Sequence, residues 1–342
     1  MRSTVIQTPA VRTAIVALGV IAVLFAVRAA AGILAPFLLA IVITVLVQST
    51  VAWLRRRGLP TWVALVVVGG TLAIVLVGLT LLIDTGLDNL SSDLPRLRQA
   101  LETQVKAIEA NLASLGLPQV QAGTRLQQAA DTSGNIATSI LEEIGSLASS
   151  AMLVIFYVLF LLLESTVLPA KLEAAFGAAS TVGDRLGRIL ASLQSYLVVQ
   201  TMLSALVGVL VTVTLWLIGV DYALLWGVLA FLLNYVPNFG PILAAVPAVV
   251  MAFIQFGPSP QVVLTMLAYV AIFIIVGSFV YPRVMGSRVG LSPLVVLVAM
   301  ILWGWLLGPV GLILSVPLVA SVKIVADAYP PARWLAILLG GA

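Results

Sequence analysis

The sequence predicts an all-α, polytopic membrane protein with about six full spans, two opposed re-entrant helical hairpins that form an inverted repeat, and a long external amphipathic helix. Three observations lead to this fold class. Of the 342 residues, 62% are hydrophobic and only 9% are charged, and the mean hydropathy of +1.19 lies far outside the range of soluble globular domains. Long apolar runs follow one another along the chain. Two of these runs are interrupted in the middle by proline and glycine.

A membrane span needs about 20 apolar residues. The candidates lie at roughly residues 13–28, 33–54, 61–83, 146–164, 191–218 and 261–281. The first run resembles the apolar part of a secretory signal peptide, but a second apolar run follows it at once. We therefore expect the first two runs to form a helical hairpin that turns at Arg28.

Basic residues set the expected orientation, because Lys and Arg accumulate in cytoplasmic loops. The strongest marker is the run from Arg55 to Arg57, which directly follows the second span. Counting spans from this point places residues 84–145 outside the cell and both termini in the cytoplasm. Lys171, Arg185 and Arg188 then lie on a cytoplasmic interfacial helix that precedes the fifth span.

The external segment carries an apolar stripe at helical spacing. Its members recur at steps of three and four residues: Leu90, Leu94, Leu97, Leu101, Val105, Ile108, Leu112 and Leu115. The spacing predicts one helix of about 40 Å that ends at Gly116 and Pro118. Two roles remain open for this stripe. It packs on the protein's own membrane domain or on the lipid surface, or it forms a coiled-coil-like contact between subunits.

The first interrupted run reads NYVPNFGPILAAVP, from Asn234 to Pro247. Proline removes a backbone donor and breaks a helix. Irregular backbone persists at membrane depth only where it is buried in protein or lines a wet cavity. The arms at residues 223–236 and 242–256 would be about 21–22 Å long as helices, against a hydrocarbon core of about 30 Å. We therefore expect a re-entrant hairpin that enters from outside.

The second interrupted run repeats this design between residues 292 and 326, with a break at Gly308, Pro309 and Gly311. By the expected topology, this hairpin enters from the cytoplasm. A span with an outer hairpin, followed by an oppositely directed span with an inner hairpin, is typical of the inverted repeats of transporters, which bind solute at the repeat interface. The alternative is that proline and glycine only kink ordinary spans.

These assignments divide the chain into five parts. They are a three-span scaffold (1–83), the external amphipathic segment (84–145), the fourth span with its interfacial helix (146–190), a transport domain (191–326) and a cytoplasmic tail (327–342).

The composition argues against an enzyme. The chain has no cysteine and no histidine, which removes thiolate ligands and the commonest general base. Catalysis at membrane depth would need a Ser–Lys pair or paired carboxylates, and Lys323 is the only lysine near the second hairpin. We expect no catalytic residue, no metal, no cofactor and no nucleic-acid partner.

Three blocks resemble the signature blocks of the autoinducer-2 exporter family (AI-2E family transporters) of bacterial inner-membrane proteins. They are ALLWGVLAFLLNYVPNFGPILAAVPAVV (223–250), PRVMGSRVGLSPLVV (282–296) and WGWLLGPVGLILSVPL (303–318). The resemblance implies a multi-pass protein of the inner membrane that exports the quorum-sensing signal autoinducer-2 or another small solute. It also implies a homo-oligomer, of which a pentamer is one form, and hairpins that move in an elevator-like way among the membrane lipids.

The family's hairpin motifs, together with two serines, give the expected substrate pathway: Asn234, Pro237, Asn238, Gly240, Pro241, Pro247, Ser278, Pro282, Arg283, Gly286, Gly308, Gly311, Ser315 and Pro317. The sequence departs from the family at one place. Relatives often have Asn or Glu shortly before the block that begins at Pro282, where this chain has Ser278 and Tyr281. A contact made through that acidic group is not expected here. Arg283 is interpreted as a positive-inside anchor, and a cytoplasmic gate is the alternative.

Acidic residues bear on the choice between functions. Outside the external segment they are Glu164, Glu173, Asp184, Asp221 and Asp327, all expected at span ends or in loops. The resemblance also implies sodium/proton antiport, because some members of the family are described as antiporters. Cation coupling normally needs an ionisable group inside the membrane, so antiport is the second function, and a non-transporting membrane scaffold is the third. Autoinducer-2 is small and uncharged in its unborated form, which suits a lining of amides and hydroxyls. Candidates for this lining are Asn234, Asn238, Gln194, Gln200, Ser204 and Ser315; for Gln194, Gln200 and Ser204 we prefer hydrogen bonding between helices.

Overall fold

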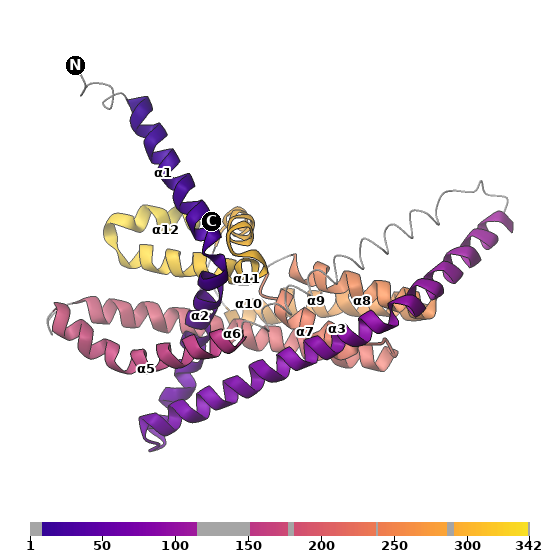
Figure 1. The fold of residues 1–342 in the computed structure, drawn as a ribbon, viewed down its shortest axis with the longest axis horizontal. Coiled ribbons are helices and arrows are strands. Elements are labelled where there is room, and N and C mark those ends of the chain that lie inside the picture. Colours follow the sequence, from indigo (N-terminus) through magenta and orange to yellow (C-terminus); the bar gives the residue numbers. More distant parts are fainter. Residues whose placement is uncertain (1–8, 115–150, 177–180, 237–238, 286–290, 341–342) are drawn as a thin grey trace.

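A computed structural model describes residues 9–114, 151–176, 181–236, 239–285 and 291–340. Within these residues the fold is all-α, as the composition and the apolar runs predict (Figure 1). The helices are α1 (Pro9–Ala29), α2 (Ala31–Arg56), α3 (Thr61–Ser114), α5 (Ala151–Phe176), α6 (Thr181–Ile218), α7 (Ala223–Leu233), α8 (Gly240–Phe256), α9 (Pro260–Ile274), a π-helix (Ile275–Val280), α10 (Tyr281–Met285), α11 (Pro293–Ala328), a short 3₁₀ turn (Pro330–Ala332) and α12 (Arg333–Leu339).

Six of the described helical segments are long and apolar enough to cross a membrane: Ala31–Arg56, Thr61–Leu90, Ala151–Leu168, Ile189–Ile218, Pro260–Val284 and Pro293–Asp327. They confirm a multi-pass membrane protein. The set differs from the predicted one at its two ends. The apolar part of α1, Ile15–Ala29, is shorter than a span, and Pro293–Asp327 counts as one long segment although its backbone breaks at Gly308.

The prediction of a helical hairpin that turns at Arg28 is wrong. Ala30 has φ −89° and ψ 5°, and its backbone N–H still donates to the carbonyl of Ala26 at 3.0 Å. The carbonyl of Ala30 in turn accepts from Leu34 at 2.9 Å, so helical hydrogen bonding continues through the junction. α1 therefore runs on into α2 with a bend rather than a reversal (Figure 1). The chain does not form two antiparallel spans here. The expected hairpin therefore no longer supports placing the amino terminus on the same side of the membrane as Arg55.

α3 is one continuous helix of 54 residues, about 81 Å long. The expected boundary between the third span and the external segment, at residues 83 and 84, lies inside this helix. The helix contacts α2 and α5 with its first part, and it lies along α7 and α8 with its later part (Figure 1). Leu90 of the apolar stripe is buried in the core formed with α6, α7 and α8, whereas Leu115, Gly116 and Pro118 lie outside the described residues.

α6 and α7 pack closely because each carries a glycine at the crossing. A Cβ added to Gly227 would lie 2.7 Å from the carbonyl oxygen of Gly208, and one added to Gly208 would lie 2.9 Å from the carbonyl oxygen of Gly227. Small residues let helix backbones approach in membranes, where helix packing depends on van der Waals contact. The turn between the helices uses positive φ at Gly219 (87°) and Tyr222 (59°).

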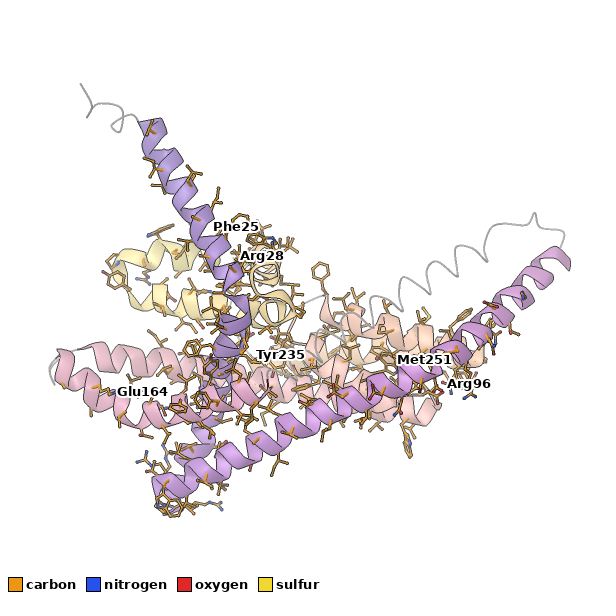
Figure 2. All side chains as sticks on the ribbon, in the orientation of Figure 1. Phe25, Arg28, Arg96, Glu164, Tyr235 and Met251 are labelled. Carbon is orange, nitrogen blue, oxygen red and sulfur yellow. The ribbon has the colours of Figure 1, made fainter. Side chains whose placement is uncertain are left out.

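The two other main contact regions surround α2. On one side α2, α3 and α5 share a core of apolar residues that includes Ala40, Val68 and Val158. On another side α11 packs against α1 and α2, with Leu307 and Leu314 buried there. Figure 2 labels Arg28 on this part of α1, and its guanidinium lies 4.7 Å from the centre of the Trp305 ring on α11.

Candidate functional site

The helices α7 and α8 meet at the first interrupted run. α7 ends at Leu233 and α8 begins at Gly240. A Cβ on Gly240 would lie 1.8 Å from the carbonyl oxygen of Leu233, which is far too close, so only glycine fits at this crossing. Pro237 and Asn238, between the helices, lie outside the described residues.

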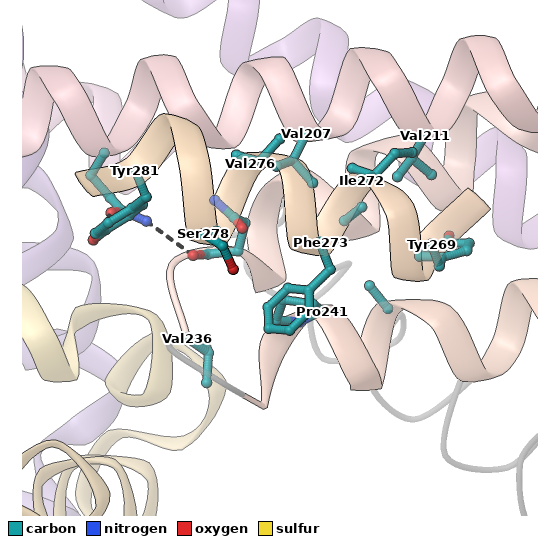
Figure 3. Close-up of a pocket in the computed structure, with 15 residues that line it drawn as sticks. Val207, Val211, Val236, Pro241, Tyr269, Ile272, Phe273, Val276, Ser278 and Tyr281 are labelled. Atoms are coloured by element: carbon teal, nitrogen blue, oxygen red, sulfur yellow. Dashed lines mark hydrogen bonds between the residues drawn. The ribbon is translucent and has the colours of Figure 1, made fainter. Parts of the chain in front are cut away.

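A cavity of about 360 Å³ lies between α6, the α7–α8 pair and the helix that runs from α9 into α10 (Figure 3). Its volume falls within the usual range for small-molecule sites. The described residues that line it are Gln200, Val207, Val211, Ala230, Asn234, Val236, Pro241, Ala244, Tyr269, Ile272, Phe273, Val276, Gly277, Ser278 and Tyr281. Most are apolar, five carry a polar side chain, and none of them is charged.

A cluster of hydrogen bonds centred on Gln200 forms one end of this pocket. The Gln200 side chain is 3% exposed. Its Nε2 donates to the backbone carbonyl of Asn234 at 2.9 Å, and its Oε1 accepts from the hydroxyl of Tyr281 at 2.9 Å (Figure 3). The Asn234 Nδ2 donates to the Oγ of Ser204 at 3.0 Å. The cluster thus joins α6, the end of α7 and the start of α10.

The π-helix Ile275–Val280 turns Tyr281 toward this cluster. Tyr269, Ile272, Phe273 and Val276 recur at steps of three and four residues and so share one helix face. In a continuing α-helix, residue 280 would be next on that face. The wider i→i+5 turn accommodates an additional residue, so Tyr281 lines the pocket instead. π-helical turns of this kind are frequent at functional sites.

The hydroxyl of Tyr269 has no hydrogen-bond partner among the described residues. The side chain is only 8% exposed and lines the same pocket (Figure 3). Its near neighbour Thr265 donates to the carbonyl of Gln261 at 2.9 Å instead. An unpaired buried hydroxyl costs about 1–3 kcal/mol. The pocket therefore contains a buried polar group that has no partner among the described residues.

The acidic side chains with described positions lie away from this pocket. Glu164 is exposed and accepts a hydrogen bond from Lys171 at 2.7 Å. Asp221 lies in the turn between α6 and α7, and Asp327 lies at the end of α11. Both are exposed. Asp221 and Asp327 thus lie in a loop and at a span end, as expected, whereas Glu164 lies within the candidate span Ala151–Leu168.

The second interrupted run also has a break in its backbone. Gly308 has φ 66° and ψ −150° inside α11. A Cβ on Gly311 would lie 1.8 Å from the carbonyl oxygen of Trp303, although residues eight apart in a straight helix are about 12 Å apart. The break expected at Gly308 is therefore present, and a glycine again packs against a carbonyl of the preceding arm.

The predicted pathway residues divide into four groups. Asn234, Pro241 and Ser278 line the pocket, with Gly240 and Pro247 buried nearby on α8. Pro282 and Arg283 are exposed on α10. Gly308, Gly311, Ser315 and Pro317 lie on α11, which supplies none of the described lining residues. Pro237, Asn238 and Gly286 lie outside the described residues.

The sequence of the whole chain decides the family. The sequence pattern described as AI-2E family transporter matches residues 14–331. The chain belongs to this family.

Relatives of this AI-2E family transporter cover nearly its whole length. The AI-2 transport protein TqsA of Escherichia coli (strain K12) is 33% identical over 93% of this chain and 92% of its own. A second relative from that strain, named YhhT, is 33% identical over 94% of this chain and 91% of its own. A relative from Haemophilus influenzae is 32% identical over 96% of both chains. The protein is therefore a multi-pass membrane protein of a transporter family.

Sequence reasoning missed several lining residues of this family member. Gln200 is a candidate for the lining for which we prefer hydrogen bonding between helices; it does join helices, and it also lines the pocket. Tyr269 and Phe273 were not singled out, and Tyr281 was noted only as a departure from the family. One signal could have found the tyrosines: each carries a polar group within a largely apolar predicted span.

Proposed function

We propose that this protein exports a small, uncharged, polar solute, and that autoinducer-2 is its leading substrate. One observation carries the proposal. The described lining of the pocket offers two amides and three hydroxyls but no charged side chain. Such a lining suits a hydroxyl-rich neutral molecule such as unborated autoinducer-2, because hydrogen bonds can replace the water that the solute loses. The relative TqsA, named as an AI-2 transport protein, supports the same choice.

In this proposal the α7–α8 pair and the two arms of α11 are re-entrant hairpins that enter the membrane from opposite sides. Alternating access then arises from movement of the repeats around a site near the broken helices. Support comes from the matching construction of the two breaks, in each of which a glycine packs against a backbone carbonyl of the preceding arm. The proposed pathway runs past the pocket residues Asn234, Pro241 and Ser278.

The remaining parts of the proposal concern the setting of the protein. It acts in the bacterial inner membrane, as a homo-oligomer, with Arg55–Arg57 at the cytoplasmic face and without an enzymatic reaction. The positive-inside rule supports this orientation. Cation/proton antiport is less well supported, because no carboxylate is among the described residues that line the pocket.

Efflux of labelled autoinducer-2 from liposomes tests the proposal. Purified protein is compared with Ala244→Phe, which places a large ring in the pocket, and with Val246→Phe, two residues along α8 on an exposed position. We expect saturable efflux from the wild type and Val246→Phe, and loss of efflux in Ala244→Phe. Each variant must elute from size-exclusion chromatography like the wild type.

An imposed proton gradient, applied in a parallel set of liposomes, shows whether export is coupled to protons. Wild-type efflux no faster than from protein-free liposomes would exclude autoinducer-2 as substrate. Sodium-driven changes in internal pH in those same liposomes would then support the antiporter.

A further inference from the structure

The hydroxyl of Tyr269 is a buried polar group of the pocket that has no partner among the described residues. We propose that Tyr269 is the residue that selects the solute. Its hydroxyl donates a hydrogen bond to an oxygen of a small uncharged molecule whose carbon skeleton lies against the apolar walls. This inference rests on the proposed export function, and it adds the recognition group and the class of solute that this group accepts.

The surroundings of Tyr269 supply the first step. Ile272, Phe273 and Val276 follow it along the same helix face, and Val207 and Val211 of α6 also line the pocket. Figure 3 shows Tyr269 beside Ile272 and Val211, toward the opposite end of the pocket from Tyr281. The wall near Tyr269 is therefore apolar, and it favours the carbon skeleton of a solute.

Few polar side chains near this hydroxyl are placed to hold a water molecule. A buried water molecule is stable only with two to four polar partners. The side chains of Val211, Ile272 and Phe273 offer none. A solute differs from water because it brings its own apolar surface together with the oxygen atom.

The polar cluster at the other end of the pocket is held by bonds within the protein, and each of its two amide groups keeps one further N–H. The carboxamide of Gln200 is engaged at both ends, with Nε2 on the Asn234 carbonyl and Oε1 on the hydroxyl of Tyr281. Tyr281 thus donates its only hydroxyl proton within the protein. The Tyr269 hydroxyl is buried and has no partner among the described residues. A solute that pairs with it must therefore present an acceptor oxygen next to an apolar surface. A charged solute is disfavoured, because a buried charge requires a paired partner.

The substitution Tyr269→Phe removes only the hydroxyl and provides the test. In the liposome assay with labelled autoinducer-2, we expect KM to rise about fivefold, the effect of one lost hydrogen bond, with little change in maximal rate. Tyr235→Phe is the matched control, because the Tyr235 hydroxyl pairs with Thr201 at 2.8 Å and the residue is not among those that line the pocket. Its KM should remain at the wild-type value. An unchanged KM in Tyr269→Phe, in liposomes where the wild type exports, would overturn the inference.

Thermal unfolding of the empty transporter gives a second readout that does not depend on autoinducer-2. If the Tyr269 hydroxyl is unpaired, Tyr269→Phe should unfold at the same or a higher temperature than the wild type, whereas Tyr235→Phe should unfold at a lower one. A lower unfolding temperature for Tyr269→Phe would reveal a structural partner and would also overturn the inference. Lack of export by the wild type counts against the proposed function alone, and the unfolding comparison still decides the state of this hydroxyl.

Discussion

At the scale of single residues, the pocket combines a hydrogen-bonded polar cluster with a hydroxyl that has no partner among the described residues. Gln200 bonds at both ends of its carboxamide, which fixes its orientation between Asn234 and Tyr281. Buried networks of this kind are stabilising when every member is paired and costly when one partner is removed. The two tyrosines of one helix therefore have opposite effects on the stability of the empty protein.

Tyr281→Phe is expected to destabilise the protein by about 1–3 kcal/mol, because the substitution leaves the buried Gln200 Oε1 without its donor. Thermal unfolding in detergent measures the change. Tyr329→Phe serves as the control, since this tyrosine is exposed and such a surface change should stay within about 0.5 kcal/mol. Equal stability of the two variants would mean that the bond to Gln200 contributes nothing.

At the scale of helical elements, two breaks are built in the same way. In each, a glycine of the later helix lies against a carbonyl of the earlier one: Gly240 against Leu233, and Gly311 against Trp303. A methyl group at either position would have to displace backbone rather than a flexible side chain. The geometry of both turns therefore depends on a missing Cβ.

Gly240→Ala and Gly311→Ala should each lower the free energy of unfolding by about 1–3 kcal/mol, the usual cost of overpacking. Gly70→Ala on α3 is the control, because a Cβ there meets nothing within 4 Å. It should raise stability by up to about 1 kcal/mol, the helix-propensity difference between alanine and glycine. The three variants are compared by thermal unfolding. The close packing would be refuted if Gly240→Ala and Gly70→Ala behaved alike.

The contact between α3 and the α6–α7 turn makes a pH prediction. Burial, followed by the hydrogen bond to Asp93, raises the pKa of Tyr222 from 10.0 to about 12. The neutral phenol is thus favoured in the folded state, so its contribution is complete below pH 10 and is lost as the pH rises toward 12. We expect this part of the alkaline loss of stability to be absent in Tyr222→Phe, measured by unfolding at a series of pH values. Identical curves for wild type and variant would show that the contact does not form.

At the scale of the whole molecule, the outer surface of the helices is apolar, with exposed residues such as Trp216, Leu217 and Ile74. Exposure of this extent fits contact with lipid tails rather than with water. Charge then determines which ends face which side, because the Arg55–Arg57 run favours the cytoplasm.

Single-cysteine labelling tests this orientation directly, since the natural chain has no cysteine. Ser92→Cys on α3 and Ala170→Cys on α5 occupy exposed positions. An impermeant maleimide should label Ser92→Cys in intact cells, and should label Ala170→Cys only after the membrane is opened. The reverse pattern would invert the topology.

Sequence reasoning predicts most of the helices, because apolar length and glycine–proline breaks act locally. The break at Gly308 is an example. Sequence reasoning fails where contacts between distant residues contribute to the geometry. Arg28 was expected at a hairpin turn, yet its guanidinium lies over Trp305, far along the chain, and the helix continues.

The candidate site was predictable only in part, because contacts between residues far apart in the sequence also shape it. Asn234, Pro241 and Ser278 carry local motif signals and do line the pocket. The bond between Gln200 and Tyr281 joins residues 81 positions apart and depends on a π-helical turn. Neither this hydrogen-bonded pair nor the extra residue in the π-helical turn can be recognised from the hydrophobic periodicity of the sequence.

The continuity of α3 has a mechanical consequence. This single helix contacts α5 with its first part, and α7 and α8 with its later part, so it connects the apolar segment Thr61–Leu90 directly with the polar part beyond Leu90. An antibody fragment that binds the exposed stretch around Ser92 would restrict the movement of this helix from the aqueous side. Its binding should alter the rate of transport without any contact with the pocket.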